Sequence, residues 1–274
     1  MEKYRVILLE TDSFGVSSFY KDLKASEGFE VVVYPNLWIA YRANISYKGK
    51  LIIQTKTALL GLFFKRNRTI LILHGFIGLY EYSYIPFLLK NMFFKVVSNR
   101  SEVWSNSYIT ANINLMLWSI KTQRILYPSQ FERKSSTFLK RDIDFLFVGR
   151  NTRAKNIALA ARVVKEYNVQ NGESKKLTVV SNSLPKINDN LIDFRGLVQR
   201  GEVLELMIRS KVFISLNTLE PYGIVYEEAL AHGCLVVSPV HTGFFEKNYT
   251  NPRVIGVASN DPGEIAKDIR NKLN

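Results

Sequence analysis

The 274-residue chain has little of the chemistry that marks many enzyme classes: a single cysteine, Cys234, only three histidines and no long apolar run at its start. One cysteine excludes an internal disulfide, and a reducing compartment is the default, so we expect a cytoplasmic location. The short apolar run from Val6 to Leu9 is soon followed by Glu10 and Asp12, which predicts a first strand rather than a signal peptide. Residues 103–120 carry no charge but are rich in serine and asparagine, so they do not predict a membrane span.

Several catalytic motifs are also missing. The sequence contains no Gly-x-Ser-x-Gly elbow, no Gly-x4-Gly-Lys-Ser/Thr phosphate loop and no Cys/His cluster with zinc-ligand spacing. Asp142 and Asp144 have the spacing of an Asp-x-Asp metal motif, but they precede the predicted strand Phe145–Val148 instead of following it. The sequence therefore predicts no catalytic metal and no cofactor.

What is present is an alternation of apolar, β-branched runs with helix-compatible segments, which is typical of an α/β protein with parallel sheets. The length suits two domains, and 47% hydrophobic with 22% charged residues is a globular composition. We expect one Rossmann-like domain over residues 1–127 and another over residues 128–274. Strands are expected at residues 4–9, 28–33, 50–55, 69–75, 103–107, 124–128, 145–148, 177–181, 212–217, 234–238 and 253–258.

Positive charge is in excess, and it is unevenly distributed. The formal charge is +13; residues 1–127 hold 16 Lys and Arg against 8 Asp and Glu, and residues 128–274 hold 21 against 16. The basic cluster at residues 65–68 beside the apolar run 59–64, and the aromatic, basic stretch 79–95, favour contact with anionic lipid or nucleic acid. An ordinary solvated basic surface is an equally good interpretation.

The stretch from Leu219 to Gly233 carries the most information. It lies between two predicted buried strands, so its first part is a loop at the carboxyl edge of a parallel sheet, where such sheets bind ligands. Glu220 falls in this loop, Gly223 opens a helix, and Glu228 follows on the next turn, facing the same side. Glu227 should point elsewhere. Taken alone, the two glutamates favour a solvated loop acid and a surface helix acid.

The whole stretch, however, resembles the donor-site signature of retaining glycosyltransferases of family 4: Glu-Pro-aromatic-Gly, four residues, Glu-Ala, one residue, Ala, one residue, Gly. Every fixed position is matched. The resemblance implies the GT-B architecture, with two Rossmann-like domains facing across a cleft, the donor in the second and the acceptor in the first. It also implies metal-independent transfer of a hexose, from a UDP-glucose-like donor as a first guess, with retention of configuration.

The same resemblance implies roles for individual residues. Arg150 and Lys155 follow a predicted strand ending in glycine, as the family's diphosphate-binding pair does, and His74 follows a strand as a histidine commonly does near the transferred sugar. Glu228 would bind ribose hydroxyls and Glu220 the hexose. The implied catalytic residues are His74, Glu220, Arg150 and Lys155; the implied donor-binding residues are Gly15, Arg150, Lys155, Tyr222, Gly223, Ile224 and Glu228.

The implied partner is a nucleotide-sugar donor, while the acceptor stays open among lipid, glycan, protein and DNA. One alternative from a different class also stays open. In it, a catalytically inactive protein of the same fold binds nucleic acid, or an anionic membrane at its cytoplasmic face, through the basic N-terminal domain.

Overall fold

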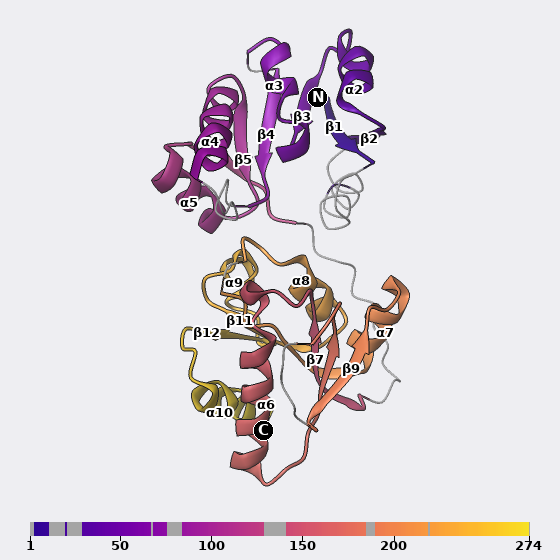
Figure 1. Cartoon of the computed structure of the whole chain (residues 1–274), viewed down its shortest axis with the longest axis vertical. Helices are drawn as coiled ribbons and strands as arrows, with labels where there is room; N and C mark the ends of the chain where they lie inside the picture. Colours follow the sequence, from indigo (N-terminus) through magenta and orange to yellow (C-terminus); the bar gives the residue numbers. More distant parts are fainter. Residues whose placement is uncertain are drawn as a thin grey trace. The chain divides into compact units, whose positions relative to one another are not determined.

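The computed structural model describes residues 3–10, 20, 29–66, 68–75, 84–128, 141–184, 190–218 and 220–273. The chain divides into two compact units, Met1–Ser129 and Gln130–Asn274 (Figure 1). The sequence places the boundary two residues earlier, between residues 127 and 128.

The first unit is built on a six-stranded parallel sheet in the order β2-β1-β3-β4-β5-β6. Its strands are β1 (Tyr4–Leu9), β2 (Glu30–Tyr34), β3 (Lys50–Ile53), β4 (Thr69–Leu73), β5 (Glu102–Ser105) and β6 (Arg124–Ile125). Its helices are α2 (Leu37–Asn44), η1 (Thr55–Thr57), α3 (Leu60–Phe63), α4 (Tyr84–Ser98) and α5 (Tyr108–Trp118). A single core cluster joins Ala40 of α2, Leu60 of α3 and Val97 of α4 to the strands, so these three helices cover the same face of the sheet.

The second unit has another six-stranded parallel sheet, in the order β12-β11-β10-β7-β8-β9. Its strands are β7 (Ile143–Val148), β8 (Leu177–Val180), β9 (Ile192–Gly196), β10 (Ser210–Ile214), β11 (Leu235–Pro239) and β12 (Val254–Val257). Renumbered within the unit, this is the 3-2-1-4-5-6 order of a Rossmann fold, and the order reverses between β7 and β10.

Helices cover both faces of this second sheet. Helices α6 (Ile157–Asn171) and α10 (Pro262–Leu273) share one core cluster with the strands. Helices α7 (Arg200–Arg209), α8 (Ile224–Ala231) and α9 (Gly243–Asn248) share the other (Figure 1). The strands are apolar on both sides because both faces are covered, which is why they appear in the sequence as continuous apolar runs.

The predicted α/β class with two parallel sheets is therefore confirmed. The sequence did not predict α2 or α4. Within the described ranges, no helix has the length and apolarity needed to cross a bilayer.

Candidate functional site

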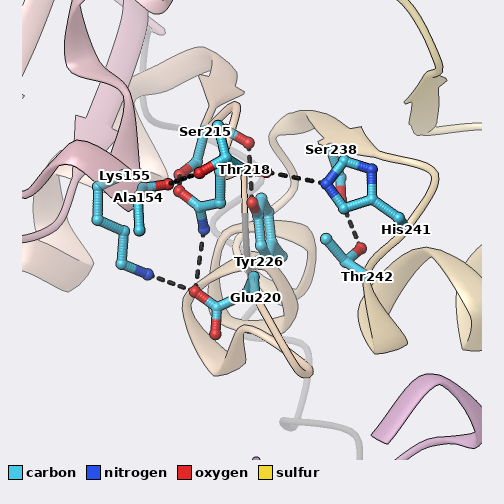
Figure 2. A network of polar contacts seen from close by, with 10 residues as sticks. Ala154, Lys155, Ser215, Thr218, Glu220, Tyr226, Ser238, His241 and Thr242 are labelled. Carbon is cyan, nitrogen blue, oxygen red and sulfur yellow. Dashed lines mark hydrogen bonds and ion pairs between the residues drawn. The ribbon is translucent and has the colours of Figure 1, made fainter. Parts of the chain in front are cut away.

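Two loops meet at the carboxyl ends of β7 and β10, where the strand order of the second sheet reverses. One loop leads from Gly149 into the short helix η2 (Arg153–Lys155), and the other leads from β10 to α8. The backbone N–H of Thr218 donates to the carbonyl of Ala154 at 2.9 Å and so ties the loops together (Figure 2). Open α/β sheets bind ligands at this kind of reversal.

Glu220 is held where these loops join. Its Oε2 accepts hydrogen bonds from Lys155 Nζ and from Asn217 Nδ2, the latter at 3.0 Å (Figure 2). Asn217 is itself buried and accepts at its Oδ1 a hydrogen bond of 3.0 Å from Ser215 Oγ. Only 16% of the Glu220 side chain is exposed. The interpretation of Glu220 as a solvated loop acid is therefore wrong, because the carboxylate is mostly buried and accepts hydrogen bonds from two side chains.

Lys155 reaches this carboxylate across Gly149. A Cβ at Gly149 would lie 3.7 Å from Cδ of Lys155 and 3.3 Å from the ring of Phe147. The lysine stem thus runs over the glycine that ends the strand. The ammonium is neutralised by Glu220, at the point where the sequence expects it to meet a diphosphate.

Gly223 shapes the turn into α8. Its φ is +88°, and an added Cβ would lie 2.4 Å from ring carbons of Tyr226, so only glycine fits this position. Tyr226 is fully buried, which raises the pKa of its phenol, and its hydroxyl donates to the Ser215 carbonyl at 2.8 Å. The N–H groups of Ile224 and Val225 open α8 and have no acceptor among the described residues. Such groups suit an anionic ligand.

The side chain of Tyr222 is turned into the protein. It is 2% exposed, and its hydroxyl donates to Glu227, which also accepts from Lys247 Nζ and Asn248 Nδ2 at 3.0 Å each. As expected from the helix geometry, Glu227 points away from Glu228. It links α8 to α9, and only the backbone of Tyr222 is left for a ligand.

The start of α9 is likewise committed to supporting this turn. The N–H groups of Gly243 and Phe244 each donate at 3.1 Å, to the carbonyls of Pro221 and Tyr222. Two of the donors that a helix start offers are thus used internally. They fix the backbone from Glu220 to Gly223.

Glu228 is buried in a pair with Arg200, the first residue of α7. Arg200 Nη1 donates to Oε2 at 2.8 Å and Nη2 donates to Oε1, a bidentate arrangement. The Glu228 side chain is 5% exposed and that of Arg200 is 37% exposed. A surface helix acid is therefore the wrong interpretation of Glu228. Its carboxylate is oriented by a cation that the sequence analysis does not single out.

Comparison with known proteins indicates what kind of protein this site belongs to. Residues 142–274 match the family described as glycosyl transferases group 1. The match covers most of the second unit, which is therefore similar to the group 1 glycosyltransferases. No curated protein sequence matches the chain.

Solved structures match the fold of the whole chain. A sucrose-phosphate synthase from Thermosynechococcus elongatus superposes with a TM-score of 0.69 at 17% identity, over 100% of this chain and 90% of that one. Anabaena Alr3699/HepE in complex with UDP gives 0.69 at 14%, over 100% and 90%. A UDP-forming trehalose-phosphate synthase from Burkholderia xenovorans gives 0.68 at 10%, over 100% and 91%. The chain has the GT-B fold, and together these findings support a glycosyltransferase.

In the second unit, Arg150 is the second cation predicted for the diphosphate. It lies in the loop after β7 and is exposed, and its carbonyl accepts a hydrogen bond from the N–H of Thr152 at 2.9 Å. Its guanidinium makes no hydrogen bond or ion pair with any residue in the described ranges. Lys155 has a carboxylate partner, whereas Arg150 has none there. The two cations are thus placed on the same loop but in different electrostatic surroundings.

His74 belongs to the first unit and follows β4, as predicted. Its Nε2 is 2.7 Å from the hydroxyl of Tyr20, and its carbonyl accepts from Asn106 Nδ2 at 3.1 Å. Burial lowers its pKa to about 4, so the imidazole is neutral near pH 7. It can exchange hydrogen bonds with a sugar but brings no charge. Gly15, the other predicted residue of this unit, lies outside the described residues.

The two aspartates of the discarded Asp-x-Asp motif are engaged elsewhere. Asp142 accepts from Arg209 at 2.9 Å, and Asp144 accepts from Lys211 at 2.9 Å, both at the start of β7. The strand begins at Ile143, so Asp144 lies within it and not before it as expected. Across the described ranges, no three His, Cys, Asp or Glu residues are grouped so as to hold a metal ion.

Sequence reasoning missed three residues that build the site. Asn217 and Arg200 orient the two glutamates, and His241 Nε2 contacts the Asn217 carbonyl at 3.2 Å. Asn217 ends an apolar run beside the motif, a signal that could have suggested a role. Arg200 is 28 residues from Glu228, and a single sequence gives no sign of their pairing.

Proposed function

We propose that this protein is a retaining glycosyltransferase that moves a hexose from a nucleotide diphosphate sugar to an acceptor hydroxyl without a metal ion. The observation that carries the proposal is the placement of Glu220 between Lys155 and Asn217 at the reversal between β7 and β10. At this place a carboxylate, which can accept hydrogen bonds from hydroxyl groups, is in direct contact with a cation, which can attract a phosphate.

In this proposal the diphosphate lies over the start of α8. It is attracted by the N–H groups of Ile224 and Val225 and by the guanidinium of Arg150, none of which has a partner among the described residues. Lys155 turns from Glu220 toward it. Glu220 then accepts hydrogen bonds from the hexose hydroxyls. The partly exposed Arg200–Glu228 pair offers a fixed carboxylate to the ribose.

The chemical step needs no protein nucleophile. The acceptor oxygen forms a bond to the anomeric carbon on the face from which the diphosphate leaves, the bond from that carbon to the diphosphate oxygen breaks, and the hydroxyl proton passes to a donor phosphate oxygen. Arg150 and Lys155 stabilise the charge that develops on the diphosphate. His74, neutral near pH 7, is assigned to the sugar side of the same reaction.

UDP-glucose is the first donor to test, since two of the structural neighbours are described with UDP. The experiment is a thermal-shift and product-release screen against UDP- and GDP-sugars, with a chelator present. Glu228→Gln is compared with Glu202→Gln, which removes an exposed acid from the neighbouring helix α7. We expect one donor class to raise the melting temperature and be hydrolysed slowly. Loss of hydrogen bonds to a charged acceptor should weaken donor binding roughly tenfold or more in Glu228→Gln alone.

Arg150→Ala tests the chemical assignment separately. It should lower kcat more than it raises the donor Kd, because its charge matters most as the bond breaks. No shift with any donor, together with salt-sensitive binding of DNA that survives Glu220→Ala, would replace this proposal with the inactive binder of nucleic acid or membrane.

A further inference from the structure

The helix layer of the first unit carries large apolar side chains that are exposed on its outer surface. Trp38 of α2 is 64% exposed, and Phe63 at the end of α3 is 61% exposed. They are linked through Tyr41, whose ring centroid lies 5.9 Å from that of Trp38 and 5.6 Å from that of Phe63. An aromatic row thus runs across both helices on their outer side. Ile39, next to Trp38, is 44% exposed.

Helix α4 continues this surface. Leu89, Met92 and Val96 are 62%, 65% and 51% exposed and follow one another at near-helical spacing, while Phe94 and Val97 are buried in the core. The helix is therefore apolar on its outer side as well as its inner side. Since α2, α3 and α4 cover the same face of the sheet, these side chains lie in the outer surface of one layer. Exposed apolar surfaces of this kind on soluble proteins mark interaction sites.

The segment that carries α2 and α3 contains basic residues but no acidic ones. Residues 31–80 contain seven Lys and Arg and no Asp or Glu. Arg42 of α2 and the pair Lys65 and Arg66 after α3 are exposed beside the aromatic row. A partner of this surface must accept both cations and apolar side chains.

We propose that the outer surface of α2, α3 and α4 docks on an anionic lipid bilayer. Trp and Phe side chains favour the headgroup region, aliphatic side chains enter the acyl boundary, and Lys and Arg are attracted by anionic lipid. Nucleic acid would use the cations and stack on the aromatic rings, but it offers nothing to Ile39, Leu89, Met92 and Val96. The proposal is independent of the donor chemistry.

The test uses flotation of the full-length protein with vesicles of phosphatidylcholine alone or with about one third phosphatidylglycerol. We expect binding only to the anionic vesicles, decreasing as salt is raised from about 0.1 M to about 0.5 M. Lys65→Gln with Arg66→Gln should weaken binding on the order of tenfold. Arg162→Gln with Lys165→Gln removes the same charge from exposed positions of α6 and should leave binding unchanged.

The apolar contribution is tested by Trp38→Ser with Phe63→Ser, matched by Tyr249→Ser, an aromatic residue that is 68% exposed in the second unit. Only the first variant should lose binding while keeping the wild-type melting temperature. Equal loss in the charge-matched control, binding unaffected by Trp38→Ser with Phe63→Ser, or preference for a DNA oligonucleotide over anionic vesicles would each overturn the proposal. So would a dimer of the free protein that the Trp38 and Phe63 substitutions dissociate.

Discussion

Replacing Arg200 should leave the buried carboxylate of Glu228 without its counter-ion. In Arg200→Ala, Glu228 keeps its position in α8 but loses both guanidinium hydrogen bonds, and its side chain is only 5% exposed. Breaking a fully buried pair costs about 3–5 kcal/mol, and an exposed pair is worth about 0–1 kcal/mol. Because Arg200 is 37% exposed, we expect an intermediate loss of about 2 kcal/mol.

For a unit of this size, about 2 kcal/mol corresponds to a decrease in melting temperature of roughly 4–8 °C. Thermal unfolding of the wild type, Arg200→Ala, Glu228→Gln and the double variant forms a complete cycle. In the double variant the neutral amide at position 228 replaces the carboxylate that Arg200→Ala leaves without a counter-ion. We therefore expect the double variant to be about 1 kcal/mol more stable than the sum of the two single effects predicts.

Arg195→Ala is the matched control, because Arg195 and Asp193 form an ion pair whose side chains are 50% and 35% exposed in the same unit. It should change stability by less than about 0.5 kcal/mol. Additive effects in the cycle, or an Arg200→Ala melting temperature equal to that of the control, would refute the reasoning that Arg200 holds Glu228.

Three further predictions concern single positions. Gly223→Ala should destabilise the second unit by about 1–3 kcal/mol and abolish donor-induced stabilisation, because the φ of +88° and the ring of Tyr226 exclude a Cβ; calorimetry with and without donor tests this, and a wild-type melting temperature would contradict it. His74 has a pKa of about 4 when folded against about 6.5 when unfolded, so it contributes stability that is complete above pH 6.5 and is lost as the pH falls toward 4. Urea unfolding of the wild type against His74→Gln should show a smaller pH slope in the variant, and equal slopes would exclude this contribution. Cys234 is fully buried, and burial raises the pKa of its thiol to about 11, so it should react with a disulfide reagent at pH 8 only after denaturant is added.

The sequence predicts this fold well where one element explains a whole run of residues. Buried parallel strands such as β4 and β10 appear as apolar, β-branched runs, and their loops place Glu220 and His74 at strand ends. Helix α4 escaped prediction because its outer side is also apolar, which removes the periodicity that identifies a surface helix.

The contacts of the site were less predictable, for a physical reason. The burial of Glu228 and its pairing with Arg200 depend on how α7 packs beside α8 on the same face of the sheet. Charge pairs between separate elements are set by tertiary packing and leave no local pattern. Taken alone, the two glutamates therefore favoured the interpretation as solvated acids, although each has a charged partner in the structure.

The contact between Lys155 and Glu220 has a consequence for selectivity. A phosphate that takes the lysine leaves the carboxylate without its counter-ion, and a sugar that takes the carboxylate leaves the lysine without its own. We expect the site to favour a ligand that carries both a phosphate and a sugar in one molecule over a ligand that carries only one of them. Under the proposed function, Glu220 would pair with Lys155 again after the sugar has been transferred, which would weaken the contact of the lysine with the nucleotide and favour its release.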